Sequence, residues 1–165
     1  MGIPWMNPDG LFQKFGVDEA AISQAGEVPT AGLHRLTEVR IDLTKLATAT
    51  QFILADTVFA AKNARIEEVE VEVETGATSG GAATLDVGLV RNDRTTELDF
   101  DGFVAAAALT TIDTAGKRLN LIRGSTGAGA LIGTSLANPG YLVAKAGTAV
   151  FTAGVLKVRV KYYFI

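Results

Sequence analysis

The chain has 165 residues, enough for one domain with a single hydrophobic core. It contains no cysteine and one histidine, His34, which excludes disulfides and thiolate sites and disfavours sites that need several histidines. The net charge of −3 lacks the basic excess of a nucleic-acid-binding protein, and no apolar stretch approaches the roughly 20 residues of a membrane span. We therefore expect no cofactor, no metal, no nucleic-acid partner and no membrane partner.

The first 32 residues differ in composition from the rest. They carry four acids against Lys14 alone, whereas the remaining 14 acids and 14 bases of residues 33–165 balance. Frequent proline and glycine prevent long regular elements, and Met1–Asp9 does not resemble a signal peptide. Apolar side chains are still frequent, which is unusual for a disordered tail. We predict an extended N-terminal arm over residues 1–32 that buries these side chains on another surface, with folding back onto its own domain as the alternative; the anchors are Trp5, Leu11, Phe12 and Phe15.

Residues 33–165 form the predicted body, which opens with two alternating segments. Apolar and charged side chains alternate over Thr37–Leu43, which predicts a strand with one buried face. A second strand is predicted over Ile66–Glu74, with valines inward and glutamates outward. Because Ile66 is out of phase with those valines, we expect a β-bulge near Glu67. Between the two segments, short apolar pieces at 51–54 and 57–59 predict a strand and a bend.

The middle of the chain alternates between strand and turn signals. Thr75–Gly81 is predicted to be a flexible turn, and Thr84–Val90 a strand. A polar loop is expected at Arg91–Thr96. The alanine-rich segment Phe103–Leu109 is the best candidate for a short helix, with strand as the alternative. A further strand is predicted at Arg118–Ile122.

The chain ends in its clearest strand signal, Val155–Ile165. Its even-numbered residues, from Leu156 to Phe164, are apolar and predicted to face the core. The cations lie on the other face, opposite in sign to the glutamates of Ile66–Glu74. Since unlike charges stabilise neighbouring strands, we predict that these two strands are antiparallel neighbours or meet across a subunit contact. The residues that could form such a contact are Tyr163, Lys157, Arg159 and Lys161.

Seven or eight short strands separated by frequent turns predict an all-β fold, an antiparallel β-sandwich or jelly roll. Three features suggest chemistry but are incomplete. Gly124–Leu131 lacks the lysine of a phosphate-binding loop, and Asp99-x-Asp101-Gly102 lacks most ligands of a calcium loop. The glutamates of Glu67–Glu74 are expected to lie in solvent. We therefore predict that the protein is not an enzyme.

Several stretches resemble capsid decoration, or cement, proteins of tailed bacteriophages. The resemblance rests on Asn7–Leu11 with Lys14–Gly16 in the arm, and on three stretches of the body, Ile112–Gly116, Leu136–Tyr141 and Phe151–Gly154. It implies a virion structural protein, made in the host cytoplasm, that binds the outer surface of the phage head as a homotrimer and bridges subunits of the major capsid protein. A head-fibre base, a tail-associated virion module and a carbohydrate-binding β-sandwich are the alternatives.

Overall fold

A computed structural model of the chain describes residues 5–6, 12–13, 34–54 and 63–164. The chain divides into two units, Met1–Ala31 and Gly32–Ile165, and each is treated by itself. In the first unit two short strands, β1 (Trp5–Met6) and β2 (Phe12–Gln13), pair antiparallel, with Trp5 opposite Gln13 and Met6 opposite Phe12. Whether residues 1–32 act as an arm, separate from a body at 33–165, stays a prediction.

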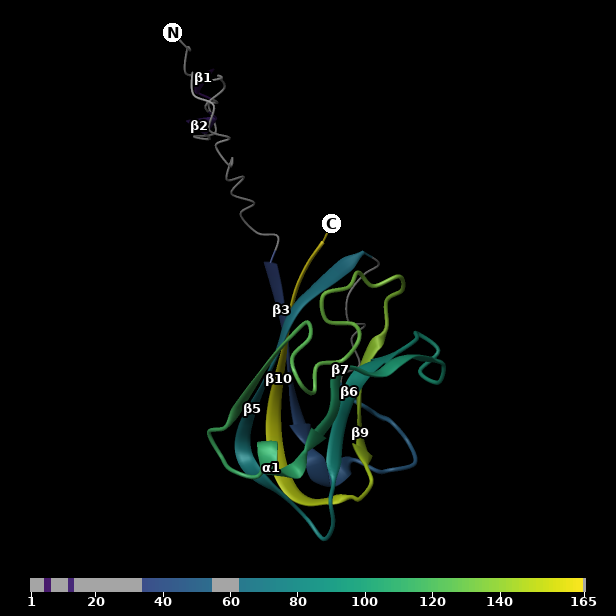
Figure 1. The fold of residues 1–165 in the computed structure, drawn as a ribbon. Helices are drawn as coiled ribbons and strands as arrows, with labels where there is room; N and C mark the ends of the chain where they lie inside the picture. The colour runs from purple at the N-terminus through teal and green to yellow at the C-terminus, as the bar shows by residue number, and fades with distance from the viewer. Residues whose placement is uncertain (1–4, 7–11, 14–33, 55–62, 165) are drawn as a thin grey trace. The chain divides into compact units, whose positions relative to one another are not determined.

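The second unit consists of two four-stranded antiparallel sheets that pack as a sandwich. In Figure 1, β3, β10 and β5 lie side by side, and β6, β7 and β9 lie on the other side of the core. One sheet has the order β3-β10-β5-β8, built from His34–Asp42, Phe151–Phe164, Ala64–Ser79 and Arg118–Ile122. The other has the order β4-β9-β6-β7, built from Phe52–Ile53, Tyr141–Gly147, Thr84–Val90 and Glu97–Ala108.

The pairing of these strands is nested. β3 pairs with β10, β4 with β9, β5 with β8, and β6 with β7. A double strand folded back on itself and then rolled into two layers has this order, which is a jelly roll. The predicted all-β class and strand number are confirmed. A 3-10 turn, η1 (Leu43–Lys45), and one helical turn, α1 (Leu109–Ile112), complete the described elements, and neither could cross a membrane.

The core is formed by the inward faces of both sheets. In β10, Leu156, Val158 and Val160 are fully buried, as the alternation predicts, and Tyr162 is 8% exposed. Ile66 is also fully buried, in phase with the core. It reaches the core because the register against β10 slips by one residue, from Glu68 opposite Lys161 to Ile66 opposite Tyr162. The predicted bulge at Glu67 is therefore confirmed.

Two preferred expectations for the elements are wrong, although the alternative given for the first, a strand, is confirmed. The alanine-rich segment Phe103–Leu109 is mostly strand, because its backbone pairs with β6 on one side and with a loop on the other. The helix begins only at Leu109. The predicted turn at Thr75–Gly81 is largely the end of β5, which continues to Ser79 beside the start of β10. The expected bend at 57–59 lies outside the described residues.

Candidate functional site

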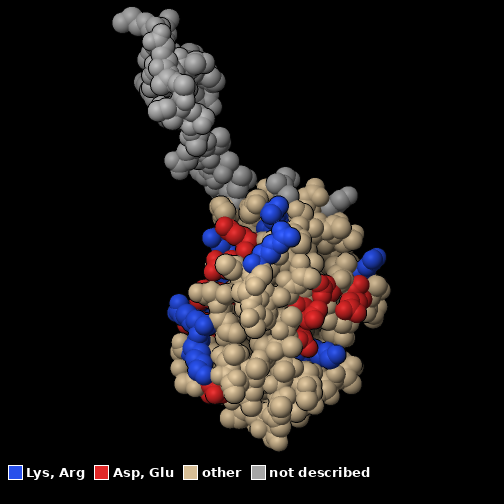
Figure 2. All heavy atoms as spheres, viewed as in Figure 1, with Lys and Arg blue, Asp and Glu red and all other residues tan. Residues whose placement is uncertain are grey.

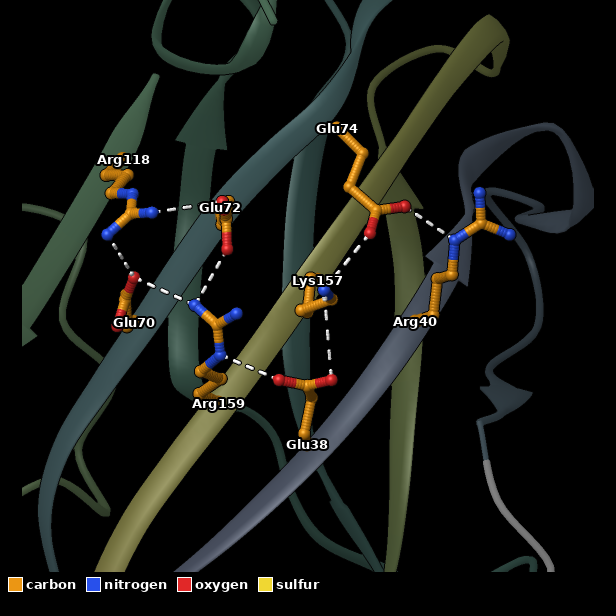
Figure 3. Close-up of polar contacts among 8 residues, drawn as sticks. All are labelled: Glu38, Arg40, Glu70, Glu72, Glu74, Arg118, Lys157 and Arg159. Carbon is orange, nitrogen blue, oxygen red and sulfur yellow. Dashed lines mark hydrogen bonds and ion pairs between the residues drawn. The ribbon is translucent and has the colours of Figure 1, made fainter. Parts of the chain in front are cut away.

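The outer face of the β3-β10-β5-β8 sheet carries a network of alternating charges, which we call the charge ladder. The register places Lys157 opposite Glu72, Arg159 opposite Glu70 and Lys161 opposite Glu68. The prediction that the basic and acidic strands are antiparallel neighbours is thus confirmed within one chain. Figure 3 shows how β3 and β8 extend the pattern on either side; the ladder consists of Glu38, Arg40, Glu70, Glu72, Glu74, Arg118, Lys157 and Arg159.

Arg159 is the centre of the charge ladder. Its Nε donates to Glu38 at 2.7 Å, and its Nη1 lies 3.0 Å from Glu70 and 2.7 Å from Glu72. Hydrogen bonds to Glu38 and then Glu72 raise the pKa of the guanidinium above its ordinary value. The same contact with Arg159 is the largest cause that lowers the pKa of Glu72. One cation therefore joins three strands, because Glu38 belongs to β3 and the other two glutamates to β5.

The rest of the charge ladder extends to both edges of the sheet. Lys157 Nζ lies 3.3 Å from a Glu74 oxygen, and Arg40 Nε donates to the other Glu74 oxygen. Both contacts lower the pKa of Glu74, and the hydrogen bond from Arg40 has the larger effect. On the opposite side, Arg118 lies 3.1 Å from Glu72. Side chains at the centre are about a quarter exposed, whereas Arg40 at the edge is 66% exposed.

The remaining predicted contact residues lie at the end of the sheet where β3 begins. Lys161 Nζ is 3.3 Å from Glu67, which also contacts His34 Nδ1 at 3.1 Å. Tyr163 is half-buried on the outer face, where its ring tilts against the His34 ring at a centroid distance of 5.6 Å. The three predicted cations Lys157, Arg159 and Lys161 therefore bind glutamates of their own sheet. Their role in a subunit contact stays a prediction.

Two of the four predicted arm residues lie in strands that the structure describes, and two do not. Trp5 lies in β1 and Phe12 in β2, which pair with each other. Leu11 and Phe15 lie outside the described residues. The predicted role of these four residues in binding a partner therefore stays a prediction.

The two glycine-containing motifs turn out to pack against one another through their backbones. Between Val87 opposite Val104 and Leu89 opposite Asp99, β7 contains several extra residues that form a large bulge. A Cβ on Gly88 would collide with the carbonyl oxygen of Asp99, so only glycine lets the bulge cross β6. A Cβ on Gly129 would collide with the backbone at Gly102 on the other side. We call this stack of β6, the β7 bulge and the Gly124–Gly133 loop the glycine stack.

The glycine-rich loop is therefore a covering segment with a packing role. It forms hydrogen bonds along the outer edge of β7, from Ala105 N to the Gly127 oxygen at 2.9 Å and from Leu131 N to the Gly102 oxygen at 2.9 Å. The pairing of the motifs could not be read from sequence, because it depends on which strand the loop lies beside.

The carboxyl groups of the bulge are in an unfavourable setting for negative charge. Asp99 is half-buried and its pKa is raised to about 6, first by desolvation and then by the hydrogen bond and charge of Asp101. A carboxyl whose ionised form is disfavoured in this way is a poorer ligand for a calcium ion than a fully ionised one. In the described part of the chain, no three His, Cys, Asp or Glu residues are grouped closely enough to hold a metal ion.

One further surface feature lies away from the charge ladder. An open depression of about 240 Å³ lies between the loop after β6 and the turn before β9, lined by Arg91, Asn92, Asp93, Asn138 and Pro139. Both Asp93 oxygens accept hydrogen bonds from Thr96, and these lower the pKa of Asp93 to about 2. On the face shown in Figure 2, acidic and basic groups lie side by side between large uncharged areas.

Comparison with known proteins shows which solved structures have a similar fold. No protein-family model and no curated protein matches the chain. Three solved structures share the fold: a chain in the acid-stable capsid of Helicobacter pylori bacteriophage KHP30 (14% identity, TM-score 0.51, covering 80% of this chain and 88% of that chain); one in the cyanophage Pam1 capsid asymmetric unit (15%, 0.56, 92% and 100%); and one in the capsid of Ralstonia phage GP4 (21%, 0.56, 86% and 92%). At these identities the similarity shows a common fold.

Proposed function

We propose that this chain is a structural protein of a tailed-phage virion, specifically a decoration or cement protein. It binds the outer surface of the phage head and bridges neighbouring subunits of the major capsid protein. The observation that carries the proposal is the fold: the jelly roll matches chains of three phage capsid structures over 88% to 100% of their length. The arm and body motifs that resemble cement proteins point to the same role.

The residues support a binding role that depends on the arm more than on the body. The centre of the charge ladder is already ion-paired within its own sheet, so these charges are not free to hold a partner strongly. Apolar anchors in the arm offer more, since each buried large side chain contributes roughly 1.5–3 kcal/mol before ordering costs. We propose that Trp5, Leu11, Phe12 and Phe15 fill apolar depressions between capsid subunits.

Trimer formation completes the proposal. A single arm binds weakly after its ordering cost, but three arms on one trimer raise the effective concentration of each at the capsid. The mass of the purified protein in solution tests this point directly. A monomeric protein that remains monomeric at high concentration and still decorates heads would contradict the trimer.

Deletion of residues 1–20 tests the role of the arm. We expect the shortened protein to keep its β-sheet circular dichroism and its melting temperature, and to lose binding to undecorated heads. A matched pair of point variants, Phe12→Ala and Gln13→Ala, separates side-chain burial from loss of chain, because only the first removes an anchor. Full decoration of heads by the shortened protein would show that the arm is not the binding element.

Particle imaging separates decoration from the other virion roles. A decoration protein gives density repeated over the icosahedral faces of the head. A head-fibre base or a tail-associated module would instead give density at fibre attachment points or along the tail. Density at those sites alone would replace the decoration role while keeping the protein in the virion.

A further inference from the structure

The two sheets present four edges, and they are protected to different degrees. The outer edge of β7 is covered by the Gly124–Gly133 loop through backbone hydrogen bonds. β4 and β8 are short, with two and five residues. β3 has nine residues and, among the residues that the structure describes, is paired only with β10. An open edge of that length can pair with another strand.

β3 also lacks the usual features that block pairing at an edge. All nine residues pair with β10 without a register shift, so no bulge bends the edge away. The segment His34–Asp42 contains no proline. Leu36, on its outer face, is 61% exposed. Charged side chains remain as a barrier, and their order decides which strand the edge can accept.

The charges of β3 are self-complementary in one antiparallel register. If two copies of β3 pair with Val39 opposite Val39 of the second copy, each Glu38 lies opposite an Arg40. A shift by one pair in either direction instead places Glu38 opposite Glu38, or Arg40 opposite Arg40. Opposed unlike charges stabilise a strand pair, and opposed like charges destabilise it. Both side chains are accessible, at 46% and 66% exposure.

We propose that β3 is an interaction surface for a second copy of this chain, which it binds edge to edge about a two-fold axis at Val39. The contact joins two β3-β10-β5-β8 sheets into one continuous sheet of eight strands. Glu38 keeps its own partner Arg159 and gains Arg40 of the second copy, so the charge ladder continues across the axis. The proposal does not depend on capsid binding.

Cysteine cross-linking tests the register, since the natural chain has no cysteine. Directly opposite residues of an antiparallel pair have Cα atoms about 4.5–5.5 Å apart, within the range of a disulfide, whereas diagonal ones are roughly 7–8 Å apart. We therefore expect a mixture of Glu38→Cys and Arg40→Cys chains to cross-link roughly tenfold faster than either variant alone. In the mixed pair one disulfide forms while the other Glu38–Arg40 contact is retained.

Controls keep this experiment decisive. Thr126→Cys, at an exposed loop position, sets the rate of random collision. Both β3 variants should fold, because Arg159 retains Glu70 and Glu72, and Glu74 retains Lys157; circular dichroism and melting check this. The unmodified protein should form particles of two chains, or of six chains where two trimers join through β3, and this association should weaken at high salt. Cross-linking of the mixture at the Thr126→Cys rate, or faster cross-linking of Glu38→Cys alone, would overturn the proposal.

Discussion

The charge ladder and the glycine stack both bring carboxyl groups close together, but they surround them differently. In the charge ladder every glutamate of the centre contacts a cation, and the pKa values of Glu72 and Glu74 are lowered. In the glycine stack, Asp99 faces Asp101 in a partly dry setting, and its pKa is raised. The first region favours the ionised form and the second opposes it. A position in a β-strand therefore does not by itself decide how a carboxyl behaves; its degree of burial and the charges beside it do.

The largest expected effect is on the free energy of unfolding, and it comes from the close backbone packing of the glycine stack. Gly88→Ala or Gly129→Ala places a Cβ against backbone that has no room to move. We expect each to lower the free energy of unfolding by about 3 kcal/mol, measured by urea denaturation. Gly80→Ala is the matched control, because nothing lies within 4 Å of its added Cβ. Equal stability of all three variants would show that the stack is not tightly packed.

Removal of the central cation tests the charge ladder. Arg159→Gln leaves Glu38, Glu70 and Glu72 close together with fewer opposite charges. We expect a lower melting temperature at low salt and a smaller difference from the natural protein in 1 M salt, because these partly exposed charges are screened. Arg91→Gln removes an exposed charge from the loop after β6 and serves as control. A loss that is independent of salt would point to packing of the arginine stem instead.

The contrast between these regions also explains what could be predicted from sequence. Alternation along β5 and β10 is a local property, so it indicated both strands, their buried faces and the bulge at Glu67. Opposite charges then identified the two strands as neighbours. The glycine stack could not be predicted, because Gly88, Gly102 and Gly129 come from three segments that meet only in the folded chain. Phe103–Leu109 was open between helix and strand for the same reason, since pairing with β6 decides it.

The glycine stack should respond to pH in a direction set by Asp99. Its folded pKa of about 6 lies above the ordinary value of 3.8, so the folded state holds the proton more tightly than the unfolded state. This contribution is complete below about pH 3.8 and is lost as pH rises through 6. Asp99→Asn, which is neutral at all pH values, should therefore stabilise the protein at pH 7 by about 1 kcal/mol, reduced by partial exposure, and not at pH 3.5.

A second variant identifies the cause of that shift. In Asp101→Asn the neighbouring charge is gone while the burial of Asp99 remains, so the pKa of Asp99 should fall below 6 but stay above 3.8, as carboxyl chemical shifts measured against pH would show. If the pKa of Asp99 stays near 6 in this variant, desolvation alone raises it. If it is near 3.8 in the natural protein, the region does not oppose ionisation and the comparison with the charge ladder fails.

The smallest expected effect has the opposite sign and comes from the edge of the charge ladder. The pKa of Glu74 is lowered, first by Arg40 and then by Lys157, so its ionised form contributes stability above the ordinary value of 4.5. That contribution is lost as pH falls through the lowered pKa. Glu74→Gln should therefore melt at a lower temperature than the natural protein at pH 7. Its melting temperature should also decline less steeply between pH 5 and 3.

Arg40, which contacts Glu74, lies on β3, the strand proposed to pair with a second copy. The decline of melting temperature with pH should have the same shape at high protein concentration, where β3 is paired, as at low concentration. A decline that is identical in Glu74→Gln and the natural protein would mean that the acid response arises elsewhere, with Asp93, whose pKa is lowered to about 2, as the next carboxyl to test.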